Sequence, residues 1–235
     1  MRNPVTTFVV VLVALAVLPG SIRQAQAQAD RYPSMAPLDQ YLIPDESAEI
    51  ALARSAAPPS ISDDATVMVL GPKGYRTAVQ GKNGFLCYVE RSWAHDTDHP
   101  EFWNPKARTP NCFNAAAADS VSPLYLMKTR LVLQGKSKAE IAQAIAAAQE
   151  SGKLPALAPG AMCYMMSTEQ YINDQGRSWH PHVMFYVAGD AEKSWGANLP
   201  GSPVLAAYDP QARLTTFFVV VNYWSDGTPG PPIEH

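Results

Sequence analysis

Residues 65–92, "ATVMVLGPKGYRTAVQGKNGFLCYVERS", carry the strongest β-strand signal of the chain. They hold three short runs rich in β-branched and aromatic residues, separated by the turn-forming segments GPKG and GKNG. Asn83 and Gly84 both tolerate the positive φ that a two-residue hairpin requires. The pattern therefore predicts an antiparallel meander of three strands from Thr66 to Arg91. Apolar residues are consecutive from Phe85 to Val89, which predicts a third strand covered on both faces.

An arm and a short helix are expected before the meander. Residues 30–44 contain three prolines and no periodicity, which indicates an extended arm. Asp45 can cap a helix that begins at Glu46, and the consecutive prolines Pro58 and Pro59 end it.

A long connection and two helices are expected after the meander. Residues 92–114 are polar and aromatic, and connections of this length are often functional or held by a cross-link. Ser122 can cap the first helix, which ends at Gly135. Ser137 and Glu140 form a capping box at the start of the second.

Three further strands complete the expected fold. They are the apolar runs at residues 161–167, 182–188 and 213–224, and the last is expected to be a central strand. The order of elements predicts an α+β class, with a mostly antiparallel sheet of about six strands and helices packed on it. Residues 45–224 form this single domain, and residues 225–235, rich in glycine and proline, are expected to be a loose tail.

The N-terminal residues predict export. Arg2 precedes an apolar block at residues 8–18, and small residues follow at alternating positions. This is the pattern of a secretory signal peptide over residues 1–29, cleaved after Ala27 or Ala29. The alternative is an uncleaved anchor, but the apolar block is shorter than the roughly 20 residues that span a bilayer. The mature protein is therefore expected in the periplasm or outside the cell, with no membrane anchor.

The charge of the mature chain disfavours nucleic acid as a partner. The whole chain has 18 basic and 21 acidic residues, a net charge of −3. Removing residues 1–29 takes away Arg2 and Arg23 and no acidic residue, so that −3 becomes −5. A mildly acidic protein lacks the basic surface that binds DNA or anionic lipid.

The three cysteines predict one disulfide bond and one free thiol. We predict a bond between Cys87, in a strand, and Cys112, at the end of the long connection, because it would hold that connection to the sheet. Cys163 would then be reduced and buried. The alternative pairing is Cys87 with Cys163, because both lie in strands before a tyrosine.

Two histidine segments offer candidate metal ligands. His180 and His182 stand two residues apart at the start of a strand, so they can face one zinc or copper ion. The second segment, HDTDHPE, contains His95 and His99 with acidic residues around them. Folding would have to bring the two segments together to complete a site. Otherwise His180 is solvated, His182 is a packed sheet residue and the second segment is an exposed acidic loop.

Other catalytic arrangements have less support in the sequence. It contains neither a G-x-S-x-G nucleophile motif nor a phosphate-binding loop of the G-x-x-x-x-G-K-[ST] form. Cys163 can be considered a nucleophile paired with His182, but a cysteine in an apolar strand is more often a small buried residue. The five tryptophans lie in loops or at element ends, where they either stack on a ligand or close the core.

Three blocks carry a resemblance to a known group of proteins: NGFLCYVERSW at 83–93, SKAEIAQAIAAAQESGK at 137–153 and HPHVMFY at 180–186. Together they resemble a family of uncharacterised exported bacterial proteins, over most of the mature chain. The resemblance implies export and a single domain, and it draws attention to Cys87, Cys112 and His182. It implies no particular activity.

Two functions from different classes remain. The first is a non-enzymatic exported module that binds a small molecule or a protein partner through the long connection and the strand ends, without a cofactor. The second is a metal-dependent hydrolase that holds zinc with His180 and His182 together with His95 and His99. The absence of a complete catalytic set favours the first.

Overall fold

The computed structural model describes residues 31–232, so the predicted signal peptide, residues 1–29, lies outside the described residues. The elements are η1 (Leu38–Gln40), α2 (Glu46–Arg54), α3 (Pro59–Ser62), β1 (Thr66–Gly71), β2 (Gly74–Val79), β3 (Leu86–Glu90), η2 (Ser92–Ala94), β4 (Thr109–Phe113), α4 (Ala115–Ser120), α5 (Ser122–Leu133), α6 (Lys138–Glu150), β5 (Met162–Met165), β6 (His182–Ala188), η3 (Glu192–Trp195), β7 (Val204–Asp209) and β8 (Leu214–Val220).

The predicted α+β class is confirmed. Within residues 31–232, one sheet contains eight strands in the order β2-β1-β3-β4-β5-β6-β8-β7, and most neighbours are antiparallel. The sequence predicted about six strands because β4 and β7 carry weak signals. Pro110 and Asn111 make β4 resemble a turn, and β7 lies among the glycines and prolines around Gly201. Strand β8, expected to be central, has β6 and β7 as neighbours, and the edge strand is β7.

The predicted antiparallel meander is wrong in its pairing. β1 pairs with β2 in antiparallel fashion, but β3 lies on the other side of β1 and runs parallel to it. The turn at Asn83–Gly84 therefore does not close a hairpin; it belongs to a connection that crosses the end of β1. Lys82 N and Asn83 N donate to Asp64 O at this crossing. A Cβ atom on Gly81 would lie 2.2 Å from Thr66 N, so only glycine permits the close approach.

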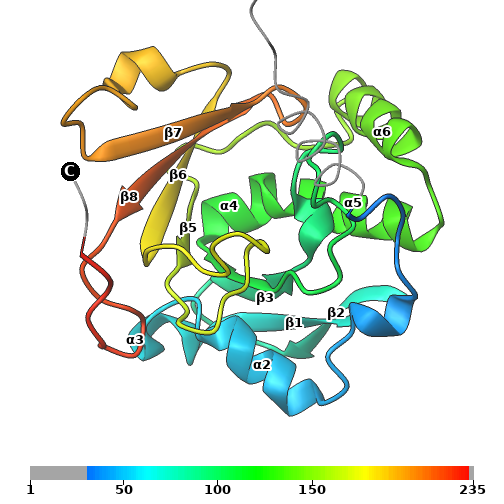
Figure 1. Cartoon of the computed structure of the whole chain (residues 1–235), viewed down its shortest axis with the longest axis horizontal. Coiled ribbons are helices and arrows are strands. Elements are labelled where there is room, and N and C mark those ends of the chain that lie inside the picture. The colour runs from blue at the N-terminus through cyan, green and yellow to red at the C-terminus, as the bar shows by residue number, and fades with distance from the viewer. Residues whose placement is uncertain (1–30, 233–235) are drawn as a thin grey trace, which may run out of the picture.

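Strand β3 is covered on both faces, as its apolar run predicts. Cys87 and Val89 pack with alanines of α2 and of the segment after it. Tyr88 faces the opposite side, where it packs with Phe113 and with α4 and α5. Figure 1 shows the consequence: α2 and α3 lie beside β1, and the green helices α4, α5 and α6 occupy the other side of the molecule.

The disulfide between Cys87 and Cys112 is confirmed. The two residues are directly paired across β3 and β4, and both are fully buried. Cys163 is a free, buried cysteine, so the alternative pairing of Cys87 with Cys163 is wrong. Because Cys112 lies in a strand, the bond joins two sheet strands and does not hold a loop to the sheet.

The helix starts follow the sequence signals in part. Ser137 and Glu140 form the complete capping box of α6. The Asp45 side chain caps α2 by accepting from Ser47 N at 2.9 Å. Ser122, expected to cap α5, is instead its first residue, and no side chain caps this helix because α4 leads directly into it through Val121.

The C-terminal segment differs from the expected loose tail. Tyr223 pairs with Pro229, and Gly230 N donates to Asn222 O, which makes a small hairpin. Ser225 joins this hairpin to the body: its amide donates to Met166 O at 2.9 Å and its hydroxyl to Ser55 O at 2.6 Å. These bonds, which no local sequence pattern predicts, hold the segment as far as Gly230.

The edge strand β7 is protected by side chains. Asn198 acts as a substitute strand partner: its amide donates to Ala206 O and accepts from Ala206 N, at 2.8 and 3.0 Å. Glu192 accepts from Tyr208 N further along the same edge. Such blocking of free backbone groups prevents pairing with another chain.

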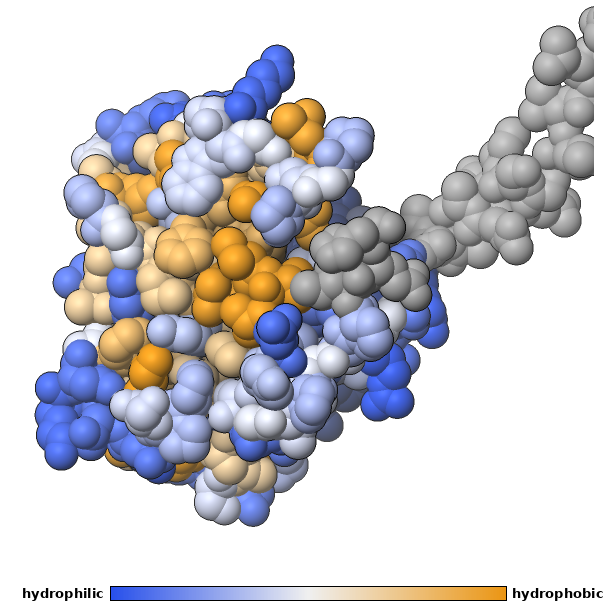
Figure 2. Space-filling model, turned by 90° about the vertical axis from the view of Figure 1, so that its left-hand side faces the viewer, coloured by the Kyte–Doolittle hydropathy of each residue, from blue (hydrophilic) through white to orange (hydrophobic). Residues whose placement is uncertain are grey.

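The side of the molecule on which β7 and β8 lie also carries hydrophobic side chains. Figure 2 shows them gathered in the centre of that face.

Among the described residues, no helix combines the length and the apolar character needed to cross a bilayer.

Candidate functional site

A pocket of about 880 Å³ opens on the face of the sheet that Tyr88 and α5 share. Side chains from β3, β4, β5, β6, β8 and β7 form its floor. Residues 91–95, at η2, and residues 172–179, in the loop before β6, form its sides. The volume lies within the range of pockets that enclose small organic molecules, about 300–1,000 Å³.

One end of the pocket is apolar. Met165, Met184 and Leu205 line it together with Phe218 and Trp179. The Trp179 ring lies against the His182 ring with a centroid separation of 4.8 Å, and 6.1 Å from the Phe218 ring. Strand alternation explains this surface, because every second residue of β6 and β8 points to the same side.

A chain of polar side chains crosses the floor from β6 to β3. The Tyr186 hydroxyl group lies 3.1 Å from Cys163 Sγ, and the thiol lies 3.6 Å from Asn111 Oδ1. The amide group of Asn111 donates to Glu90 Oε2 at 3.0 Å. The four residues lie on four neighbouring strands, so the sheet itself sets the order of the chain. It ends in the carboxyl group of Glu90.

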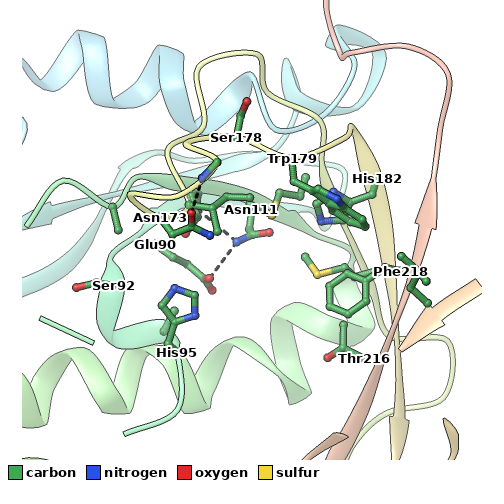
Figure 3. Close-up of a pocket in the computed structure, with 18 of the residues that line it drawn as sticks. Glu90, Ser92, His95, Asn111, Asn173, Ser178, Trp179, His182, Thr216 and Phe218 are labelled. Carbon is green, nitrogen blue, oxygen red and sulfur yellow. Dashed lines mark hydrogen bonds between the residues drawn. The ribbon is translucent and has the colours of Figure 1, made fainter. Parts of the chain in front are cut away.

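Glu90 is the unusual group of this site. It is 8% exposed, and its Oε1 atom has no hydrogen-bond partner among residues 31–232. Burial raises the pKa of the Glu90 carboxyl group to about 8, against smaller lowering effects of Lys128, Asn111 and Tyr88. The carboxyl group is therefore mainly protonated at neutral pH. Figure 3 shows it between Asn111 and His95, at the opposite end of the pocket from Phe218.

His95 and His99 stack on each other beside Glu90, with ring centroids 4.1 Å apart. Burial, with smaller contributions from His99 and Lys128, lowers the pKa of His95 to about 4. Burial also lowers the pKa of His99, and the Nδ1 atom of this ring accepts from Glu101 N at 3.2 Å. His95, which is neutral at physiological pH, lines the pocket.

His182 lies across the pocket from His95 (Figure 3). It is 2% exposed, and burial lowers its pKa to about 4. Its Nδ1 atom lies 2.7 Å from His180 O. Because a carbonyl oxygen only accepts, Nδ1 carries the ring hydrogen and Nε2 is left unprotonated. His180 lies outside the pocket lining, two residues before β6 begins.

Of the four candidate metal ligands, His95 and His182 line the pocket, on different walls, and His99 and His180 do not line it. Within residues 31–232, no group of three or more His, Cys, Asp or Glu side chains is placed to hold a metal ion. The suggested pair of Cys163 and His182 does not form either, because the thiol contacts Tyr186 and Asn111. Burial raises the pKa of the Cys163 thiol far above its ordinary value, so the nucleophilic thiolate is disfavoured.

The loop at residues 172–179, which forms one side of the pocket, is held by the carboxylate of Asp174. The side chain of Asp174 is 3% exposed and accepts from Tyr32 at 2.6 Å and from Tyr171. Arg31 and Lys106 form ion pairs with it at 2.9 and 3.2 Å. Burial raises the pKa of Asp174, but the hydrogen bonds from Tyr171, Tyr32 and Lys106 outweigh this and keep the pKa well below its ordinary value. Asp174 thus joins the N-terminal arm, the 92–114 connection and the loop.

Replacing Asp174 with asparagine is expected to loosen this loop. Hydrogen bonds to a charged group contribute about 1.5–3 kcal/mol, so amide hydrogens of residues 173–179 should exchange at least about tenfold faster. The same loosening is expected in the wild type as the pH falls below about 4. A carboxyl group whose pKa is lower in the folded than in the unfolded protein stabilises the fold fully only above its unfolded pKa, and this contribution is lost as the group becomes protonated. Hydrogen exchange measured by mass spectrometry checks both results.

Asp226→Asn is the control for that experiment, because Asp226 is an exposed turn residue whose side chain bonds, within residues 31–232, to Thr228 alone. Equal exchange in the wild type and Asp174→Asn would show that the loop is held by its apolar contacts instead.

Comparison with known proteins adds no relative: no family model, no curated protein and no solved structure matches the chain.

Sequence reasoning pointed to His95 and His182 but passed over Glu90 and Asn111. A signal for Glu90 was present, since it extends an apolar strand and alternates with Leu86 and Tyr88 onto a buried face. Asn111 had no such signal, because the residues of β4 were predicted to belong to the connection at 92–114.

Proposed function

We propose that this protein binds a small, mainly apolar organic molecule in the pocket, as a binding module and not as a hydrolase. The observation that carries the proposal is the cavity of about 880 Å³ with an apolar end and one buried polar end. Ligand sites of small molecules have this composition: hydrophobic walls with a few placed polar groups that orient the ligand. The loop held by Asp174 would cover the occupant.

The metal-dependent hydrolase has weaker support. It requires three protein ligands around one ion. The described residues place His95 and His182 on different walls and provide no such group. Both rings are neutral, so they can pack against an organic ligand as well as bind a metal ion.

Binding of an apolar fluorophore tests the proposal. N-phenyl-1-naphthylamine, which fluoresces weakly in water, should bind saturably with one molecule per protein. Leu205→Glu should lower its affinity at least about tenfold, because the new carboxylate in the apolar wall loses more than about 1.4 kcal/mol of solvation when the ligand covers it. Equilibrium titration of both proteins gives the affinities.

Tyr208→Glu is the matched control. Tyr208 lies on the same strand as Leu205 and is equally exposed, 38% in each case, but it does not line the pocket. Its replacement should leave the affinity unchanged. No saturable binding, or equal loss in both variants, would contradict the proposal.

We also propose that the protein works after export, in the periplasm or outside the cell. The Cys87–Cys112 bond supports this, because disulfides persist mainly in oxidising compartments. The mature chain recovered from the periplasm or medium should begin at Gln28 or Asp30, as N-terminal peptide mass spectrometry measures. A mature pool that still carries Met1 would contradict the predicted cleavage.

A further inference from the structure

We propose that the ligand presents a carbonyl oxygen to Glu90, whose protonated carboxyl group donates the hydrogen bond that orients it. This inference rests on the proposed binding function and names its ligand class: an apolar body with a ketone, ester or amide carbonyl at one end.

The direction of the hydrogen bonds on the pocket floor carries the inference. Asn111 Nδ2 can only donate, so Glu90 Oε2, 3.0 Å away, is an acceptor. In a protonated carboxyl group that accepting atom is the carbonyl oxygen, and the hydroxyl is therefore Oε1. Oε1 is the atom without a partner among residues 31–232, and Glu90 lines the cavity. The unsatisfied group is thus a donor, and it requires an acceptor.

The rest of the polar chain reinforces this direction. Cys163 can donate to Asn111 Oδ1, and then its sulfur accepts from the Tyr186 hydroxyl. Each donor of this chain is consequently used by the next residue, up to Glu90. The Tyr88 hydroxyl is likewise used, since it donates to Ser122 Oγ at 3.2 Å. Within the chain, Glu90 is the residue left with a hydrogen atom to offer.

The surroundings of Glu90 keep the carboxyl group neutral. It forms no ion pair within the described part of the chain, and its exposed fraction is 8%. Lys128 of α5 is the cation that acts on it, but the ammonium group donates to Ala94 O and His95 O, both at 3.2 Å. His95 is neutral, as described above. An isolated buried carboxylate is costly, so the proton is retained.

Five further titratable groups around Glu90 are uncharged at neutral pH. They come from several elements: Tyr75 of β2, Tyr88 of β3, Tyr125 of α5, Cys163 of β5 and Tyr186 of β6. Burial raises the pKa of each of them above its ordinary value. Compared with these five groups, Glu90 therefore loses its proton first, as the pH rises through about 8.

A pair of probes that differ only in the carbonyl group tests the inference. The first is 6-propionyl-2-(dimethylamino)naphthalene, and the second is its deoxygenated analogue 6-propyl-2-(dimethylamino)naphthalene. At pH 6.5 the wild type should bind the ketone about fivefold more tightly, as one neutral hydrogen bond provides. At pH 9.5, where Glu90 has lost its proton, the preference should disappear, because a carboxylate repels a carbonyl oxygen.

Two variants identify Glu90 as the donor. Glu90→Gln retains an acceptor for Asn111 and an amide donor toward the cavity, but it cannot ionise. It should prefer the ketone equally at both pH values. Glu90→Met has no donor and should bind both probes with the affinity of the deoxygenated one. Circular dichroism and melting temperature establish that both variants are folded.

The outcomes separate this inference from the proposed function. If neither probe binds the wild type, both are overturned. If both probes bind with equal affinity at pH 6.5, the binding function stands and the carbonyl inference is overturned. A ketone preference that persists in Glu90→Met, or in the wild type at pH 9.5, shows that another group is the donor and also overturns it.

Discussion

Replacing Glu49 with alanine is expected to lower the free energy of unfolding by about 3–5 kcal/mol, because it leaves a buried guanidinium group without its counterion. Arg91 and Glu49 pair at 2.9 Å with side chains that are 0% and 1% exposed. Glu49 Oε1 also accepts from Leu70 N, which ties α2 to β1. Thermal unfolding should show a melting temperature lower by roughly 6–20 °C for a chain of this size.

Two further variants show whether the unpaired charge is the cause. In the double variant Glu49→Ala/Arg91→Met both charges are absent, so much of the lost stability should return. Glu46→Ala is the surface control on the same helix. Glu46 pairs with Arg76, but both side chains are about half exposed, so the change should stay within about 1 kcal/mol. A double variant less stable than Glu49→Ala would contradict the explanation.

Removing the disulfide by Cys87→Ala/Cys112→Ala is expected to cost about 3.5 kcal/mol on the chain-entropy model. The two cysteines are 25 residues apart in sequence, and the bond restricts the unfolded chain over that loop. Denaturant unfolding of this variant, and of the wild type with and without reductant, measures the loss.

Cys163→Ala is the matched control for the disulfide. It removes the free cysteine and leaves the bond in place, so its stability should still fall on reduction by the same amount as in the wild type. Wild-type stability that does not change on complete reduction would contradict the prediction. Non-reducing peptide mapping should find Cys163 unlinked.

Local sequence signals predicted those parts of the fold that depend on neighbouring residues. The capping box of α6 is one example, because Ser137 and Glu140 satisfy backbone groups of their own helix turn. Strand β6 is another, because its unbroken apolar run needs no distant partner to be recognised. Strand β4 was missed, because Pro110 and Asn111 belong to it through their pairing with Val89 and Tyr88 of β3, which is distant in the sequence.

The candidate site was predictable only in fragments. His95 and His182 were singled out, and both line the pocket, but the relation between them was not visible in the chain. Glu90 and Asn111 are 21 residues apart, and they meet because β3 and β4 pair in one register. The direction of their hydrogen bond, on which the ligand class depends, is a property of that pairing.

Local sequence patterns were sufficient to predict the α+β class, the caps of α2 and α6, the two-sided burial of β3 and one disulfide bond among three cysteines. These features follow from periodicity, capping and residue type, which act over a few neighbouring positions. The tertiary structure was needed to establish that β3 runs parallel to β1, that Cys112 lies in a strand and that Glu90 is buried with its Oε1 atom unpartnered among residues 31–232. The physical reason is that pairing, burial and pKa depend on groups brought together from distant parts of the chain, and only the complete fold specifies which groups these are.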